Sequence, residues 1–146
     1  MRALIIVATL LFTGGIISLA YAAPNKIEYE LRDRCGKEAK DFWQTYHKEN
    51  RVIASAHGRE TISNYRNHYN ATLNKCFLLE ITTTVGGTVA DTERLFDVNE
   101  NGNYGVFAKD NADRVIVCRV KGSKNECSSE YEWRKLITPF MQDATN

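Results

Sequence analysis

Apolar residues recur every three or four positions in the first part of the chain beyond residue 25. They are Ile27, Leu31, Cys35, Ala39, Phe42 and Tyr46. Charged residues fill the positions between them, and apolar residues at this spacing lie on one face of an α-helix. The pattern therefore predicts a long amphipathic helix over residues 25–50, with Cys35 directed at the core.

A second, shorter helix is predicted from Thr61 to Asn74. Its apolar residues follow one another at spacings of three, four and four, at Ile62, Tyr65, Tyr69 and Leu73. Four asparagines in this segment have poor helix propensity. Residues 51–60, which precede it, are weakly patterned, and His57-Gly58 is expected to form a turn.

From Cys76 the period of the apolar residues changes to two, which is typical of a β-strand. Phe77, Leu79 and Ile81 face one way, and Cys76, Leu78 and Glu80 face the other. Further strands are predicted over residues 92–98, 104–108 and 115–120. The turns expected between the strands are Gly86-Gly87, Asn101-Gly102 and Asp110 to Asp113.

A final helix is expected after Ser129, because Ser129 and Glu132 have the spacing of a capping box. Pro139 lies inside its apolar pattern and should kink or end the helix near Thr138. The predicted fold class is therefore α+β: N-terminal helices, a four-stranded antiparallel β meander and a C-terminal helix in one domain, residues 23–146. This plan is similar to that of cystatin-like rolls, as an analogy of architecture alone.

The first 22 residues have the pattern of a secretory signal peptide. Met1-Arg2 gives a positive start, an apolar run follows, and Ala20-Tyr21-Ala22 places small residues where a signal peptidase cleaves. The alternative is an uncleaved membrane anchor, since the apolar run nearly spans a bilayer. We expect cleavage, and hence a periplasmic or extracellular protein.

Four cysteines lie beyond the signal peptide, and an even number in an exported chain predicts disulfide bonds. Three pairings are possible. We expect Cys118–Cys127, which leaves Cys35–Cys76. In the loop-entropy model the two bonds contribute about 3 and about 4 kcal/mol. A zinc site is the alternative, but the chain has no Cys-x-x-Cys spacing and its histidines are scattered.

The charge of the exported chain disfavours two classes of partner. Only Arg2 of the 19 basic residues lies in the signal peptide, so 18 basic residues balance the 18 acidic ones. A neutral chain without a basic run has no electrostatic footprint for nucleic acid. It is equally unsuited to an anionic membrane surface.

A half-match to a calcium-binding loop occurs at residues 97–102. Asp97, Asn99, Asn101 and Gly102 occupy the first, third, fifth and sixth positions. The twelfth position, which should be glutamate, is Ala108, and a hairpin turn explains Asn101-Gly102 without a metal. We therefore expect no metal site and no cofactor.

The three histidines offer little catalytic context. No serine has a nucleophile-elbow context, and the expected disulfides occupy the cysteines. His47 is expected to be solvated. His68 is expected to be a hydrogen-bonded structural residue. The enzyme alternative is a small exported hydrolase that uses His57 or His68 with an acidic partner.

The segment around His68 is also the best candidate for a binding surface. Tyrosine and asparagine offer contact area and hydrogen bonds at low entropic cost, and both occur at residues 65–70. The alternative is that Tyr65 and Tyr69 fill the core. Asn67, His68 and Asn70 are the groups to which the sequence assigns no specific structural contact, and are the candidate binding residues.

Asn67-His68-Tyr69-Asn70 followed by residues 73–77 resembles a pattern in small exported bacterial proteins of unknown function. Cys127 and the closing Pro139-Phe140-Met141 are similar to features of the same proteins, so the resemblance covers roughly residues 65–141. It implies a bacterial exported protein and supports the order of elements, but no activity. We expect a non-catalytic protein of the cell envelope that binds an envelope protein or ligand. The alternatives are the hydrolase and a structural envelope component.

Overall fold

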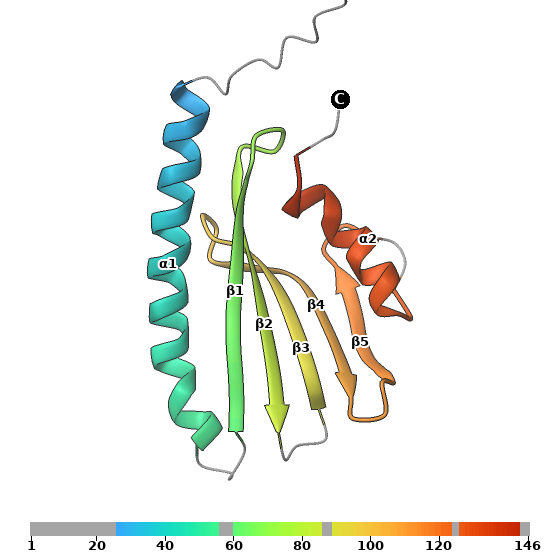
Figure 1. Cartoon of the computed structure of the whole chain (residues 1–146). Coiled ribbons are helices and arrows are strands. Elements are labelled where there is room, and N and C mark those ends of the chain that lie inside the picture. The colour runs from blue at the N-terminus through green and yellow to red at the C-terminus, as the bar shows by residue number, and fades with distance from the viewer. Residues whose placement is uncertain (1–25, 56–59, 86–88, 124–125, 144–146) are drawn as a thin grey trace, which may run out of the picture.

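The structure is a computed structural model that describes residues 26–55, 60–85, 89–123 and 126–143. In chain order its elements are α1 (Lys26–Ser55), β1 (Glu60–Asn70), β2 (Lys75–Val85), β3 (Val89–Asp97), β4 (Gly102–Asp110), β5 (Val115–Val120) and α2 (Glu130–Met141) (Figure 1). The predicted α+β class is confirmed. The signal peptide and the turns predicted at His57-Gly58 and Gly86-Gly87 lie outside the described residues.

The five strands form one antiparallel sheet in the order β1-β2-β3-β4-β5, so each strand pairs with the next along the chain. The predicted meander is therefore confirmed, but it has five strands and not four. The last strand, β5, matches the expected range of residues 115–120, while β3 and β4 are longer than predicted.

The additional strand is β1, which replaces the helix predicted from Thr61 to Asn74. That prediction was wrong because two members of its apolar stripe do not face a core: Ile62 is 63% exposed and Leu73 is 44% exposed. Tyr65 and Tyr69 lie four residues apart, a spacing that puts two residues on the same face of a strand as well as of a helix. Pairing along all of β2 stabilises the strand.

The turn from β1 to β2 depends on two asparagines. The Asn70 side-chain oxygen accepts a hydrogen bond from the backbone N–H of Leu73 at 2.9 Å. Asn74 has a φ of 50°, in the left-handed region that asparagine tolerates better than most residues. The segment that ends the predicted helix is thus the hairpin turn.

The sheet separates two apolar cores, because alternate residues of β2 face opposite sides. On one side, Cys76 and Leu78 of β2 pack with Phe96 and with Cys35 and Ala39 of α1. On the other side, Phe77 and Leu79 pack with α2, from which Trp133, Ile137 and Met141 are buried. β2 is therefore buried on both faces, which explains its nearly continuous apolar run.

Ser129 caps the first turn of α2, and Trp133 packs the helix against the sheet. Ser129 is the N-cap residue, and its hydroxyl accepts a hydrogen bond from Glu132 N–H, as the capping box predicts. Trp133 fits against Gly105 of β4, where a Cβ atom would lie 3.2 Å from the indole ring. The helix continues to Met141 with Pro139 inside it, so it does not end near Thr138, which was one of the two effects predicted for this proline.

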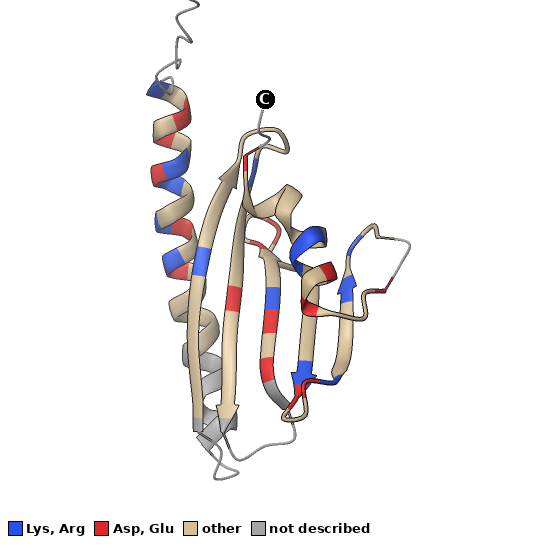
Figure 2. Cartoon of the chain, turned by 45° about the vertical axis from the view of Figure 1, so that its right-hand side comes forward, with Lys and Arg blue, Asp and Glu red and all other residues tan. Residues whose placement is uncertain are grey.

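Both edges of the sheet have a neighbour. The helix α1 lies alongside β1 in both views of the chain (Figures 1 and 2). At the other edge, Cys127 N–H donates a hydrogen bond to Cys118 of β5 at 3.2 Å. The disulfides Cys35–Cys76 and Cys118–Cys127, both as predicted, tie these neighbours to the sheet. An edge strand with such a neighbour is a poorer template for pairing with another chain.

Candidate binding site

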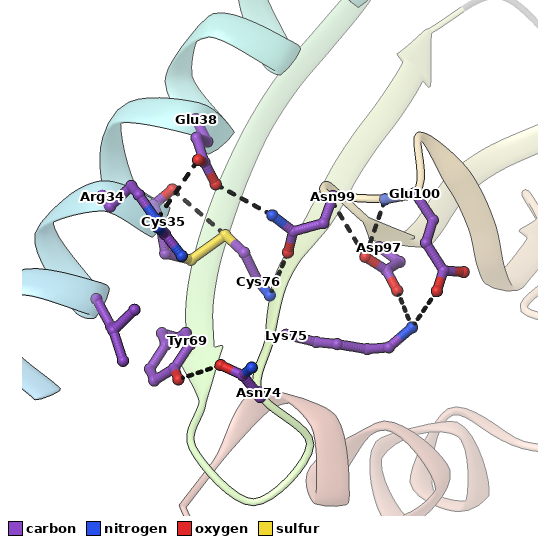
Figure 3. A pocket seen from close by; sticks show the side chains of 11 residues that line it. Arg34, Cys35, Glu38, Tyr69, Asn74, Lys75, Cys76, Asp97, Asn99 and Glu100 are labelled. Atoms are coloured by element: carbon purple, nitrogen blue, oxygen red, sulfur yellow. Dashed lines mark hydrogen bonds and ion pairs between the residues drawn. A yellow bond between two sulfur atoms is a disulfide. The ribbon is translucent and has the colours of Figure 1, made fainter.

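A pocket of about 230 Å³ opens beside the Cys35–Cys76 disulfide, between α1, the β1–β2 turn and the β3–β4 hairpin (Figure 3). Its lining residues are Leu31, Arg34, Cys35, Glu38, Tyr69, Asn74, Lys75, Cys76, Asp97, Asn99 and Glu100. Sites for drug-sized ligands usually measure about 300–1,000 Å³. This pocket therefore has room for a small molecule or for the end of a larger one.

The lining combines an apolar wall with polar groups. Leu31 and the Tyr69 ring contribute apolar surface next to the disulfide, and the Tyr69 hydroxyl donates a hydrogen bond to Asn74 Oδ1 at 2.7 Å. The disulfide joins α1 to β2 with a Cα–Cα distance of 5.4 Å. It thereby fixes the two elements that form opposite walls of the pocket.

Asp97 organises the hairpin side of the pocket. Its side chain is fully buried, and Oδ1 accepts hydrogen bonds from the backbone N–H groups of Asn99 at 3.1 Å and Glu100 at 3.3 Å. These bonds form the Asx-type turn that aspartate favours. Asn101 closes the turn with a φ of 48°. Local chemistry thus sets the positions of Asn99 and Glu100 in the pocket.

The Lys75 ammonium lies between two carboxylates of this hairpin. It donates a hydrogen bond to Asp97 Oδ2 and another to Glu100 Oε1 at 2.7 Å. It also lies 5.8 Å from the centre of the Tyr104 ring. The hydrogen bonds to Asp97 and Glu100 raise the pKa of Lys75 above its ordinary value, because they stabilise the charged form.

This ion pair shares one residue with the half-match to a calcium loop at residues 97–102, since Asp97 occupies the first position of that loop. Two oxygen-bearing side chains of that segment, Asp97 and Glu100, converge on one cation, and the cation is the chain's own Lys75. Within the described residues, no group of three or more metal-ligating side chains gathers in space.

On the helix side, the polar groups of the rim connect to the hairpin through Asn99. Arg34 lies 3.7 Å from Glu38 on α1, and Glu38 Oε2 accepts a hydrogen bond from Asn99 Nδ2 at 3.2 Å. The Asn99 side-chain oxygen accepts a hydrogen bond from the Cys76 N–H at 3.0 Å. Figure 3 shows this chain of contacts from α1 across to Lys75.

The sequence-predicted candidates Asn67, His68 and Asn70 do not form one site, because Asn67 faces the opposite side of the sheet from His68 and Asn70, and none of the three lines the pocket. Asn67 faces α1, with Nδ2 3.9 Å from Cys35 Sγ. Asn70 is 3% exposed and has a structural role, since Nδ2 donates a hydrogen bond to the Pro139 carbonyl at 2.7 Å. Tyr69, which belongs to the predicted binding surface, is buried at 8% exposure.

His68 lies on the α2 side of the sheet, near the end of the described chain. Its Nε2 atom is 3.3 Å from Asp143 Oδ1 but makes no well-aligned hydrogen bond. Asp143 also accepts a hydrogen bond from Arg32 of α1 at 2.7 Å. Burial lowers the pKa of His68 below its ordinary value, and the charge of Arg32 acts in the same direction, while Asp143 opposes both.

A second histidine–carboxylate contact was missed by sequence reasoning. His47, expected to be solvated, packs against Trp43 with ring centres 3.6 Å apart and the ring planes tilted by 44°, and its Nε2 lies 3.3 Å from Glu80 Oε1. Glu80 is 3% exposed and also contacts Arg94, which donates a hydrogen bond to the Tyr46 hydroxyl at 3.0 Å. The sequence signal for this contact was the alternation in β2, which places Glu80 on the same face as Cys76 and Leu78, toward α1.

Comparisons of the chain with protein-family models, with curated proteins and with solved structures find no match. The resemblance to small exported bacterial proteins therefore remains a prediction. Among the helices of the described residues, none has the length and apolar character needed to cross a bilayer.

Proposed function

We propose that this chain is an exported bacterial protein of the cell envelope that binds a ligand without transforming it. The observation that carries the proposal is the pocket beside Cys35–Cys76, which combines an apolar wall with a polar rim, as ligand sites do. The signal-peptide pattern and the two disulfides support the assignment to an oxidising compartment.

The chemistry of the lining favours binding over catalysis. Its two cysteines form the disulfide, Lys75 is held by two carboxylates, and Asp97 accepts three hydrogen bonds. None of the 11 lining residues is a serine, threonine or histidine. The common nucleophile–base pairs are thus missing from this pocket.

The test is whether the exported protein retains a small molecule in the pocket. Glu38→Trp places a large side chain on α1 at the mouth, and Lys40→Trp adds the same side chain on α1 at an exposed position outside the lining. Each protein is purified natively from its own periplasm, extracted with solvent and analysed by mass spectrometry. We expect wild type and K40W to release a common small molecule that E38W lacks.

The runner-up is a small exported hydrolase that uses a histidine–carboxylate pair, which the His68–Asp143 and His47–Glu80 contacts favour. Neither pair lines the pocket. Turnover of an envelope polymer by the purified protein, lost in His68→Ala or His47→Ala and unaffected in E38W, would establish the hydrolase. Combined with the release of no ligand by wild type, that result would overturn the binding proposal.

A further inference from the structure

We infer that the ligand of this pocket is a small organic cation with a primary ammonium group, held at the rim by Glu100. This inference rests on the proposed binding function and names the class of ligand. The first observation is the charge of the lining: three carboxylates and two basic groups, with a net charge of −1.

The surplus negative charge lies at the hairpin. Asp97, Glu100 and Lys75 together have a net charge of −1, because one ammonium group neutralises only one of the two carboxylates. Asp97 is fully buried and points at Lys75, whereas the Glu100 side chain is 56% exposed and uses only Oε1 for Lys75. Glu100 Oε2 has no ion pair or hydrogen bond to the described residues, so it is the acceptor that remains for a ligand.

On the α1 side of the rim, Glu38 is a further carboxylate, and no positive charge is in excess there. The Glu38 side chain is 40% exposed, and the Arg34 guanidinium beside it at 3.7 Å cancels its charge. Arg34 is 63% exposed and therefore mostly solvated. An anionic ligand would have to compete with Glu38 for Arg34 while approaching the excess negative charge of the hairpin.

The pocket wall already binds an ammonium group from within the chain. Lys75 is held by two carboxylates and lies over the Tyr104 ring, which are the groups that recognise organic amines. A second ammonium at Glu100 Oε2 would neutralise the remaining charge. Leu31 and Tyr69 would contact the alkyl part of such a ligand.

The probe is 1,5-diaminopentane, titrated into the ¹⁵N-labelled exported protein and followed by backbone amide shifts. Pentane-1,5-diol and glutarate have the same five-carbon chain and are the neutral and anionic controls. We expect saturable shifts at the amides of Cys76, Asn99 and Glu100 with the diamine alone. The shifts should weaken as salt is added, because the rim is exposed.

Substitutions then assign the contact. Glu100→Gln should weaken diamine binding about three- to fivefold, the worth of a partly exposed ion pair, and Glu38→Gln should weaken it by less. Glu30→Gln is the matched control, because Glu30 is an exposed carboxylate on α1 outside the pocket. All three positions are exposed enough for the variants to fold, which their amide spectra check.

Two results would overturn the inference while leaving the pocket a ligand site. One is binding of the diol or glutarate at these amides as tightly as the diamine. The other is an equal loss of affinity in E30Q and E100Q, which would indicate unspecific attraction. If no probe binds and the native protein also releases no small molecule, the inference and the proposed function both fail.

Discussion

At the scale of single residues, His68 links stability to pH. Burial holds its pKa below the ordinary value of 6.5, so the unfolded chain takes up a proton at a pH where the folded chain does not. The contribution of neutral His68 to the free energy of unfolding is therefore fully present above pH 6.5, and it is lost as the pH falls toward the lowered pKa. Most histidines in contact with a carboxylate have the opposite sign, but here burial outweighs Asp143.

We expect His68→Gln to remove this part of the pH dependence. Glutamine retains a polar side chain of similar reach but does not titrate. The measurement is the free energy of unfolding in urea at pH 7.5 and at pH 5.0, for wild type and H68Q. Wild type should lose more stability than H68Q between the two values. An equal loss in both proteins would show that His68 is not held in its neutral form by the fold.

At the scale of the element, the β3–β4 hairpin depends on the Lys75–Asp97 ion pair. Lys75→Met would leave the fully buried Asp97 carboxylate without its cation. Removing one partner of a buried ion pair lowers the free energy of unfolding by about 3–5 kcal/mol. We expect a loss of about 2–3 kcal/mol here, because the Lys75 side chain is 27% exposed. Lys37→Met is the control, since its partner Asp33 lies on the surface.

A double substitution distinguishes a broken ion pair from lost packing. In Lys75→Met with Asp97→Asn, no charge is left buried, and the asparagine oxygen still accepts the N–H groups of Asn99 and Glu100. Urea unfolding should show most of the K75M loss recovered in the double variant. Additive losses, or a K75M loss no larger than that of K37M, would contradict this account of the hairpin.

Element types were predictable from the sequence where periodicity had one interpretation. The α1 stripe, the alternation in β2 and the Ser129 cap each correspond to the observed element. Tyr65 and Tyr69 fit both periods, so pairing with β2 decided the element, and pairing is a long-range property. The four asparagines of this segment were a local signal against the helix and in favour of a turn, but asparagine does not favour a strand either.

The candidate site was less predictable than the fold, because it joins segments that are far apart in the sequence. Glu38 and Asn99 are 61 residues apart and meet only when α1 lies on the sheet. The half-match to a calcium loop placed Asp97 and Asn99 in one turn, but the cation that Asp97 binds is Lys75, which comes from β2. Asn67, His68 and Asn70 lie within four residues of the sequence, but the pleat of β1 places Asn67 on the face opposite His68 and Asn70.

At the scale of the whole molecule, the two disulfides have separate consequences. Cys35–Cys76 joins α1 to β2 over a separation of 41 residues, and Cys118–Cys127 closes a separation of 9 residues at the opposite edge. The loop-entropy model gives about 4 kcal/mol for the first and about 3 kcal/mol for the second. Replacing either pair by alanines should lower the free energy of unfolding by about these amounts.

The place where the structure opens distinguishes the two disulfides better than the amount of stability lost. Apart from the disulfide, α1 is held mainly by the core around Ala39, Leu78 and Phe96 and by polar contacts at its surface. Without Cys35–Cys76 we expect α1 to open locally before the sheet unfolds. Hydrogen exchange should then show faster exchange in α1 than in β2 for C35A/C76A, whereas C118A/C127A should leave α1 protected. Equal loss of protection in α1 for both variants would mean that the chain unfolds as one unit, and that the disulfide stabilises the molecule without specifically holding the pocket wall.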